Sequence, residues 1–175
     1  MFSADLYARA LSFAAQAHSD QKTPHGFPYV VHLSCVCMEV QLALRAEAGR
    51  DEDLAIACAL LHDTIEDTTV RHIDVEHAFG ARIASGVLAL TKDAGLEKPL
   101  RMEDSLRRIL MQPAEVAMVK LADRITNLGP PPPYWLQEKR QSYRAEAQHI
   151  LERLGSVSPF LTSRLEARIQ AYPVG

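Results

Sequence analysis

The sequence has few of the features that mark secreted or membrane proteins. It has three cysteines among 175 residues, an odd number without disulfide-like spacing, which favours a reducing compartment. No apolar run approaches the roughly 20 residues that a membrane-spanning helix needs. The first residues lack the basic start and uninterrupted apolar core of a signal peptide. We therefore expect a cytoplasmic protein that does not bind or span a membrane.

An excess of positive charge is also missing. The formal net charge is −3, so no overall basic field would attract nucleic acid or an acidic membrane surface. An anionic small molecule would have to be held locally, by a metal ion or by a few placed Lys and Arg side chains. The length suits one domain with a sizeable core. Because the chain has no repeat, low-complexity tract or linker, we expect residues 1–175 to form a single domain.

Apolar periodicity predicts helices almost throughout the chain. The first stripe joins Leu6, Ala10 and Phe13 at steps of three and four residues, which is typical of a helix face. Glycine closes two long runs: we expect helices to end at Gly49 and at Gly155. The stretch GPPPPYW predicts an extended connector between two helices. The expected fold is all-α, a single helical bundle of about eight or nine helices.

The run LAIACALL, residues 54–61, is apolar enough to be a buried strand. Its alanines, its few β-branched residues and its length favour a helix. Directly after it come His62 and Asp63, then Glu66 and Asp67. On a helix, residues four apart share a face, so His62 would lie beside Glu66 and Asp63 beside Asp67. Buried imidazoles and carboxylates are costly unless paired or metal-bound, so this stretch is either a polar helix end or an active site.

Two other apolar segments each carry one displaced polar residue, His32 in PYVVHL and Asp123 in VKLADRITNL. Taken singly, such a histidine is usually a hydrogen-bonded core residue, and Asp123 beside Arg124 is usually a surface ion pair of little worth. Three segments that each carry a residue of metal-ligand type favour a shared site instead. Imidazole and carboxylate ligands together suit manganese, iron or zinc.

These motifs resemble those of the HD-domain phosphohydrolase superfamily. AHSDQ and GFPYVVH precede LLHDTIEDT, and VKLADRITNL follows, in the order typical of Rel/SpoT-type hydrolases of the alarmone (p)ppGpp. The chain most resembles the stand-alone small alarmone hydrolases, from about Ala14 to Tyr143. The resemblance implies an all-helical HD domain. It also implies removal of the 3′-pyrophosphate from guanosine-3′,5′-bis(diphosphate), ppGpp.

The resemblance further implies a role for individual residues. One divalent ion, usually Mn²⁺, would be held by His32, His62, Asp63 and Asp123. A metal ion of this kind lowers the pKa of a bound water, and the catalytic acids that would orient that water or move protons are Glu66 and Asp67. Substrate contacts around the ribose and phosphates would fall on Lys92, Asn127, Lys139, Arg140 and Tyr143.

The stretch QKTPHG departs from the family pattern. Thr23 stands where the Rel/SpoT enzymes carry an Arg that packs on the guanine base, and His25 stands where they carry a Ser. Lys22 is the only nearby cation and is expected to contact the substrate. Lys22 or His25 would take the place of the Arg, although neither offers the same planar fork. A different nucleotide, including NADPH or a 5′-nucleotide, is therefore an alternative substrate.

Three further questions stay open from the sequence. A non-catalytic nucleotide sensor is a possible function, although a pure binder has no need of the Glu66 and Asp67 pair. Trp135 and Tyr143 are either core residues of the last long helix or substrate contacts. The chain is either a monomer or a homodimer, and its partner is expected to be a small-molecule nucleotide.

Overall fold

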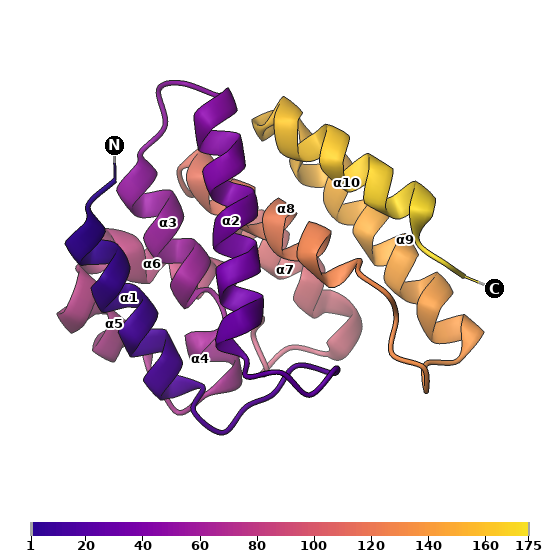
Figure 1. Ribbon diagram of the computed structural model, residues 1–175, viewed down its shortest axis with the longest axis horizontal. Helices are drawn as coiled ribbons and strands as arrows, with labels where there is room; N and C mark the ends of the chain where they lie inside the picture. Colours follow the sequence, from indigo (N-terminus) through magenta and orange to yellow (C-terminus); the bar gives the residue numbers. More distant parts are fainter. Residues whose placement is uncertain (1, 175) are drawn as a thin grey trace.

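The computed structural model describes residues 2–174, and helices account for most of them (Figure 1). The helices of at least eight residues are α1 (Ala4–Ala17), α2 (Val30–Ala46), α3 (Glu52–Leu61), α5 (His72–Phe79), α6 (Ala81–Leu90), α7 (Lys98–Leu110), α8 (Ala114–Asn127), α9 (Gln137–Leu154) and α10 (Pro159–Ala171). The short helix α4 (Thr64–Asp67) follows α3, and the 3₁₀ turn η1 (Gly155–Val157) joins α9 to α10. No strand forms in residues 2–174. The predicted all-α class is confirmed.

Side chains that precede the helices explain where several of them begin. Asp51 accepts a hydrogen bond from the backbone N–H of Leu54 at 3.0 Å, at the start of α3. Ser158 accepts one from Leu161 at 3.2 Å, and Pro159 occupies the first turn of α10. Such caps satisfy backbone donors that have no partner inside the helix. Proline suits the first helical position, because the N–H that it lacks would have no partner there.

Two predicted helices end earlier than expected. α2 ends before Gly49, which lies in the following loop with φ of 79°. α3 ends before His62, and the chain turns at His62 and Asp63 before α4 begins. The prediction of one continuous helix that places Glu66 a turn after His62 is therefore wrong. Asp63 does precede Asp67 by one helical turn, because the Asp67 N–H donates to the Asp63 carbonyl at 2.9 Å.

Three helices, α2, α3 and α8, pack together at the centre of the bundle (Figure 1). Residues 54–61 of α3 and 115–125 of α8 are buried at every position. α1 and α6 cover α3, while α9 and α10 lie side by side against α8. Helices this enclosed need apolar side chains on all faces, so polar groups in α8 require a specific partner. None of the described helices combines the length and apolar character that crossing a membrane requires.

Candidate metal centre and active site

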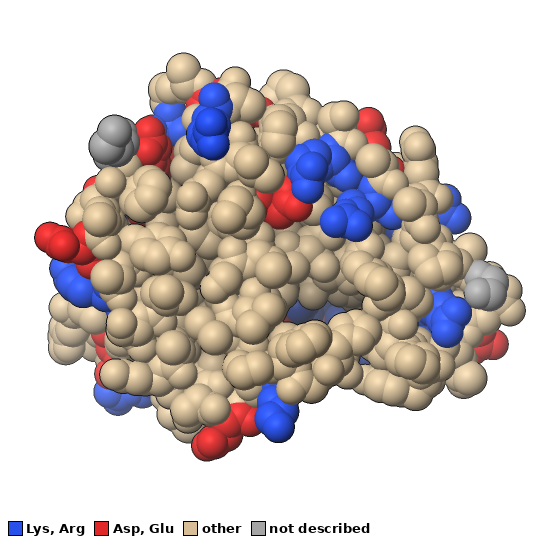
Figure 2. Space-filling model, in the orientation of Figure 1, with Lys and Arg blue, Asp and Glu red and all other residues tan. Residues whose placement is uncertain are grey.

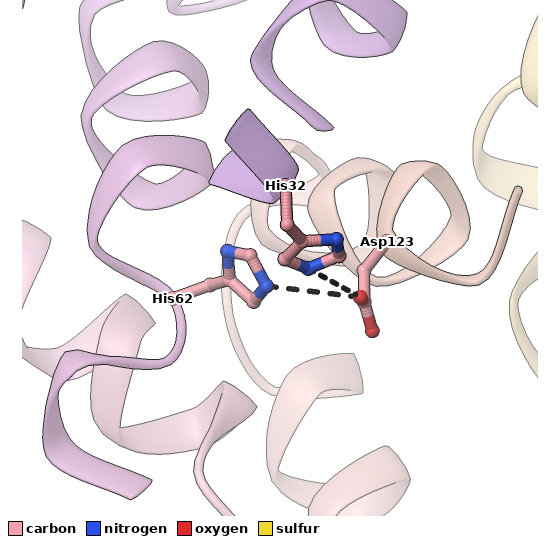
Figure 3. Close-up of side chains that lie close together, drawn as sticks. All are labelled: His32, His62 and Asp123. Carbon is pink, nitrogen blue, oxygen red and sulfur yellow. Dashed lines mark ion pairs between the residues drawn. The ribbon is translucent and has the colours of Figure 1, made fainter. Parts of the chain in front are cut away.

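The three central helices bring His32, His62 and Asp123 together (Figure 3). His32 lies in the first turn of α2, His62 directly follows α3, and Asp123 lies near the end of α8. One nitrogen or oxygen from each lies within 4.8 Å of the other two, and all three residues are buried. Oδ1 of Asp123 lies 3.4 Å from His32 Nε2 and 3.7 Å from His62 Nε2.

Asp63 adjoins this cluster. Its Oδ2 lies 2.9 Å from His62 Nε2 and 3.7 Å from His32 Nε2. The same oxygen accepts a hydrogen bond of 2.6 Å from the hydroxyl of Tyr29. The four residues predicted as metal ligands thus come from three separate segments. His32, His62 and Asp123 form the cluster, and Asp63 adjoins it through both imidazoles.

The chemistry of these groups fits a divalent metal ion. His62 Nδ1 lies 2.9 Å from the carbonyl of Ala59 and donates to it, so a neutral imidazole presents the lone pair of Nε2 to the carboxylates. Nε2 of His32 and Nε2 of His62 are both buried, and neither has a hydrogen-bond partner within residues 2–174. A buried lone pair beside carboxylate oxygens is unfavourable unless a cation lies between them. Two imidazole nitrogens with carboxylate oxygens are ligands that divalent transition metals accept.

The charges around the cluster also favour a cation at the imidazoles. Burial raises the pKa of Asp123, but Lys120, with Nζ 3.2 Å from Oδ2, and the nearby imidazoles hold that pKa well below its usual range. Burial lowers the pKa of His62, but the carboxylates of Asp63 and Asp123 hold it well above its usual range. A proton can therefore take the place of the metal ion on His62.

The acidic pair beside the cluster is anchored by two other segments. Lys92 holds Glu66 at both oxygens, with its backbone N–H donating to Oε2 at 2.8 Å and its ammonium group to Oε1 at 3.0 Å. Gln21 Nε2 donates to Asp67 Oδ2 at 3.0 Å. Burial lowers the pKa of Lys92, but Glu66 raises it above its ordinary value, so the ammonium group stays charged.

A cavity of about 610 Å³ adjoins the metal cluster and contains His32 in its wall. Figure 2 shows the hollow on this face, between the lower part of α2 and the connection from α8 to α9. The predicted substrate contacts that line it are Lys22, Asn127, Lys139 and Tyr143. Arg140 is not in its wall, and Lys92 contacts Glu66 instead. Asn127 also donates to Asp123 Oδ1 at 2.5 Å, so it touches both the cavity and a candidate ligand.

Trp135 and Tyr143 form an aromatic wall of this cavity. Their rings meet edge to face with centroids 5.0 Å apart, and Lys139 Nζ lies 5.3 Å from the Trp135 ring. The Tyr143 ring also packs against the core, and Cζ of the Arg124 guanidinium lies 4.4 Å from its centroid. Tyr143 therefore belongs to the core and to the cavity at once. Arg124 is buried and pairs with Glu146, so the surface ion pair considered for Asp123 and Arg124 does not form.

The stretch that departs from the family pattern forms another wall of the cavity. Thr23 closes a tight loop, because its N–H donates to the Phe27 carbonyl at 2.8 Å and its hydroxyl accepts from the Phe27 N–H at 3.2 Å. His25 Nε2 lies 3.2 Å from the carbonyl of Pro130 and ties this loop to the α8–α9 connection. Lys22 is exposed at the rim.

Sequence reasoning missed three residues that contact the candidate site: Gln21, Tyr29 and Lys120. Lys120 stands in an apolar run, three residues before Asp123, and that helical spacing is a signal for a buried ion pair. Gln21 and Tyr29 lie in motifs already noted, but their contacts join distant segments. No local sequence pattern predicts contacts between residues so far apart in the chain.

Comparison with known proteins identifies the family. Residues 10–156 match the HD domain. The chain belongs to the HD-domain family. It is 31% identical over 166 residues to the guanosine-3′,5′-bis(diphosphate) 3′-pyrophosphohydrolase of Drosophila melanogaster, which covers 91% of this chain and 90% of that protein. The resemblance to HD-domain proteins that the sequence motifs predicted is confirmed.

Two further HD-domain relatives extend this result. The enzyme of the same name from Aquifex aeolicus is 33% identical over 152 residues, which cover 84% of this chain and 20% of that longer protein. A solved structure described as a metazoan ortholog of SpoT that hydrolyzes ppGpp superposes with a TM-score of 0.83 and 28% identity, over 100% of this chain and 99% of its own. The similarity therefore extends over the whole fold.

Proposed function

We propose that this HD-domain protein is a metal-dependent phosphohydrolase that removes the 3′-pyrophosphate from ppGpp, with Mn²⁺ as its metal. The observation that carries the proposal is the buried cluster of His32, His62 and Asp123, with Asp63 adjoining it and an acidic pair alongside. Relatives that match nearly the full chain are named for this reaction, which supports ppGpp as the substrate.

In this proposal the residues divide the chemistry between them. His32, His62, Asp63 and Asp123 would hold the metal ion, which would supply Lewis-acid polarisation of the attacked phosphate and lower the pKa of a nearby water. Glu66 orients the attacking water and accepts its proton. Lys92 holds the Glu66 carboxylate in a fixed orientation before the substrate enters. Asp67, fixed by Gln21, holds a second water or passes the proton onward.

The cavity beside the cluster would hold the nucleotide. Lys22 and Lys139 in its wall supply positive charge for phosphates, which a chain of negative net charge must provide locally. Trp135 and Tyr143 offer ring faces and edges against which a base stacks. Asn127, between the cavity and Asp123, is placed to contact the ribose. The site therefore suits a small nucleotide as its partner. We propose that the protein acts in the cytoplasm.

Product analysis tests the proposal. The purified chain with Mn²⁺ should release pyrophosphate from ppGpp, and Glu66→Gln or Asp63→Ala should abolish the release. Glu166→Gln, on the exposed face of α10, is the matched control and should behave as the wild type. An intact ppGpp pool after incubation with metal-loaded wild-type protein would contradict the proposal.

A second candidate is an HD phosphohydrolase for another nucleotide, and Thr23 is the observation that favours it. The Thr23 side chain lines the cavity and bonds to its own loop, so it cannot stack on a base as the family's Arg does. A panel of nucleotides that includes NADPH and 5′-nucleotides distinguishes the two substrates. A nucleotide that binds without any turnover would instead indicate a sensor.

A further inference from the structure

The segment between α1 and α2 contacts two of the acidic residues at the site. The Tyr29 hydroxyl donates to Asp63 Oδ2 at 2.6 Å, and Gln21 Nε2 donates to Asp67 Oδ2 at 3.0 Å. The two donors are also joined to each other, because the Tyr29 N–H donates to the Gln21 carbonyl at 3.0 Å. One short segment therefore sets the direction of a candidate metal ligand and of a candidate catalytic acid.

His18 contacts both arms of this arrangement. Its Nδ1 lies 2.6 Å from Gln21 Oε1, and its ring stacks on the Tyr29 ring with centroids 4.8 Å apart and an interplanar angle of 27°. The Gln21 N–H donates to the His18 carbonyl at 3.0 Å, which fixes the turn between them. His18 is buried and lies outside the wall of the 610 Å³ cavity. It therefore acts on the site only through Gln21 and Tyr29 and does not face the cavity.

Hydrogen-bond chemistry fixes the tautomer of His18. The ionised carboxylate of Asp67 only accepts, so Gln21 must turn its NH₂ group toward Asp67 and its carbonyl oxygen toward His18. His18 Nδ1 must then carry the proton. Nε2 is buried and has no hydrogen-bond partner among the residues that the structure describes, which suits a lone pair. The opposite tautomer would bury an N–H without an acceptor and would set two lone pairs 2.6 Å apart.

We propose that His18 is a positioning residue for two carboxylates at once. Through Gln21 it orients Asp67, and through the Tyr29 ring it holds the hydroxyl group on Asp63. Outer groups of this kind fix the orientation of metal ligands and commonly change affinity or activity by about 10- to 100-fold when lost. The Asp67 arm rests on the proposed function, whereas the Asp63 arm is measured by metal affinity alone.

Two substitutions of His18 separate the arms. His18→Phe keeps a ring for Tyr29 but removes the donor to Gln21. His18→Asn keeps an N–H near the place of Nδ1 but removes the ring. We expect His18→Phe to lower kcat about tenfold with little change in the Kd for Mn²⁺, and His18→Asn to raise that Kd about tenfold with a smaller loss of kcat. Both quantities are measured on the full chain, with thermal unfolding as the check on folding.

Two background variants test whether each effect runs through the stated partner. In a Gln21→Ala background, His18→Phe should lower kcat no further. In a Tyr29→Phe background, which itself should weaken Mn²⁺ binding, His18→Asn should weaken it no further. Effects that add in full in either background would contradict the coupling.

Nitrogen-15 NMR of the histidine side chains gives a readout that needs neither metal nor substrate. The neutral Nδ1–H tautomer of His18 supports the proposal, and the Nε2–H tautomer overturns it. Equal losses of kcat and of Mn²⁺ affinity in both His18 variants would indicate packing alone and would also overturn it. If wild-type protein leaves ppGpp intact, the proposed function fails, while the Mn²⁺ affinities and the NMR spectrum still decide the role of His18.

Discussion

Lys92 donates hydrogen bonds to both carboxylate oxygens of Glu66, from its backbone N–H at 2.8 Å and from its ammonium group at 3.0 Å. The two residues come from the segment after α6 and from α4. Glu66 is the proposed acceptor of the water proton, and its orientation depends on this contact. The contact gives Lys92 a role at Glu66 in addition to any contact with the substrate.

Lys92→Met should therefore slow the reaction. The substitution leaves the backbone contact to Glu66 but removes the ammonium group, and general-base contributions are commonly 10²- to 10⁴-fold. We expect kcat for pyrophosphate release to fall by at least about tenfold, which is less than the loss of the whole general base would cause. Lys98→Met, at an exposed position at the start of α7, is the matched control. Unchanged kcat in Lys92→Met would contradict the proposed role.

Metal binding should release a proton. Asp63 and Asp123 hold the pKa of His62 well above its usual range despite burial, so His62 of the metal-free protein keeps its proton to a higher pH than a free imidazole does. A divalent ion binds only the neutral imidazole. Mn²⁺ affinity should therefore fall as the pH is lowered and rise as it is raised. Calorimetric titrations in two buffers of different ionisation enthalpy measure how many protons are released when Mn²⁺ binds. Identical heats in both buffers would show that no proton is released and would refute the prediction.

Trp135→Ala should weaken substrate binding more than it slows the chemical step. A stacked base is worth about 1–3 kcal/mol, which corresponds to a rise in KM of about fivefold to 150-fold. Tyr134→Ala is the control, because Tyr134 lies in the same connector but is 70% exposed and absent from the cavity wall. Steady-state kinetics separate the two parameters, and an unchanged KM in Trp135→Ala would assign Trp135 to packing only.

Gly86→Ala should destabilise the fold. A Cβ atom at Gly86 would lie 2.8 Å from Cys58 Sγ and 3.1 Å from Val116 Cγ2, where α6 packs on α3 and α8. Overpacking of this kind costs about 1–3 kcal/mol. Denaturant unfolding measures the loss, and Cys58→Ala added to Gly86→Ala should recover part of it. An equally stable Gly86→Ala protein would show that the helices shift apart at no cost.

The residues of the metal cluster could be predicted because each disturbs a local pattern. His32, His62 and Asp123 interrupt runs that are otherwise apolar, and a buried polar residue needs a partner. Those partners come together through the packing of α2, α3 and α8. The helical class followed from the same periodicity. The resemblance of the sequence motifs to the HD domain then indicated that these residues share one site, which periodicity alone does not show.

The break between α3 and α4 could not be predicted from that periodicity. The Thr64 hydroxyl, buried in the structure, donates to the Leu61 carbonyl at 2.7 Å, a local side-chain bond that competes with the helix. The contacts of Tyr29 with Asp63 and of Lys92 with Glu66 join residues 34 and 26 positions apart. Such contacts depend on how whole helices dock, and neither composition nor spacing reports them.

A metal titration followed by product analysis tests whether one metal ion bound at the His32, His62 and Asp123 cluster is required for ppGpp hydrolysis. Metal-free protein is supplied with increasing Mn²⁺ at fixed ppGpp, and bound metal and released pyrophosphate are measured together. We expect no release without metal, release in proportion to bound Mn²⁺, and saturation at one ion per chain, with Asp123→Asn failing to bind the ion. Pyrophosphate release from protein free of metal, or intact ppGpp at one bound Mn²⁺ per chain, would contradict it.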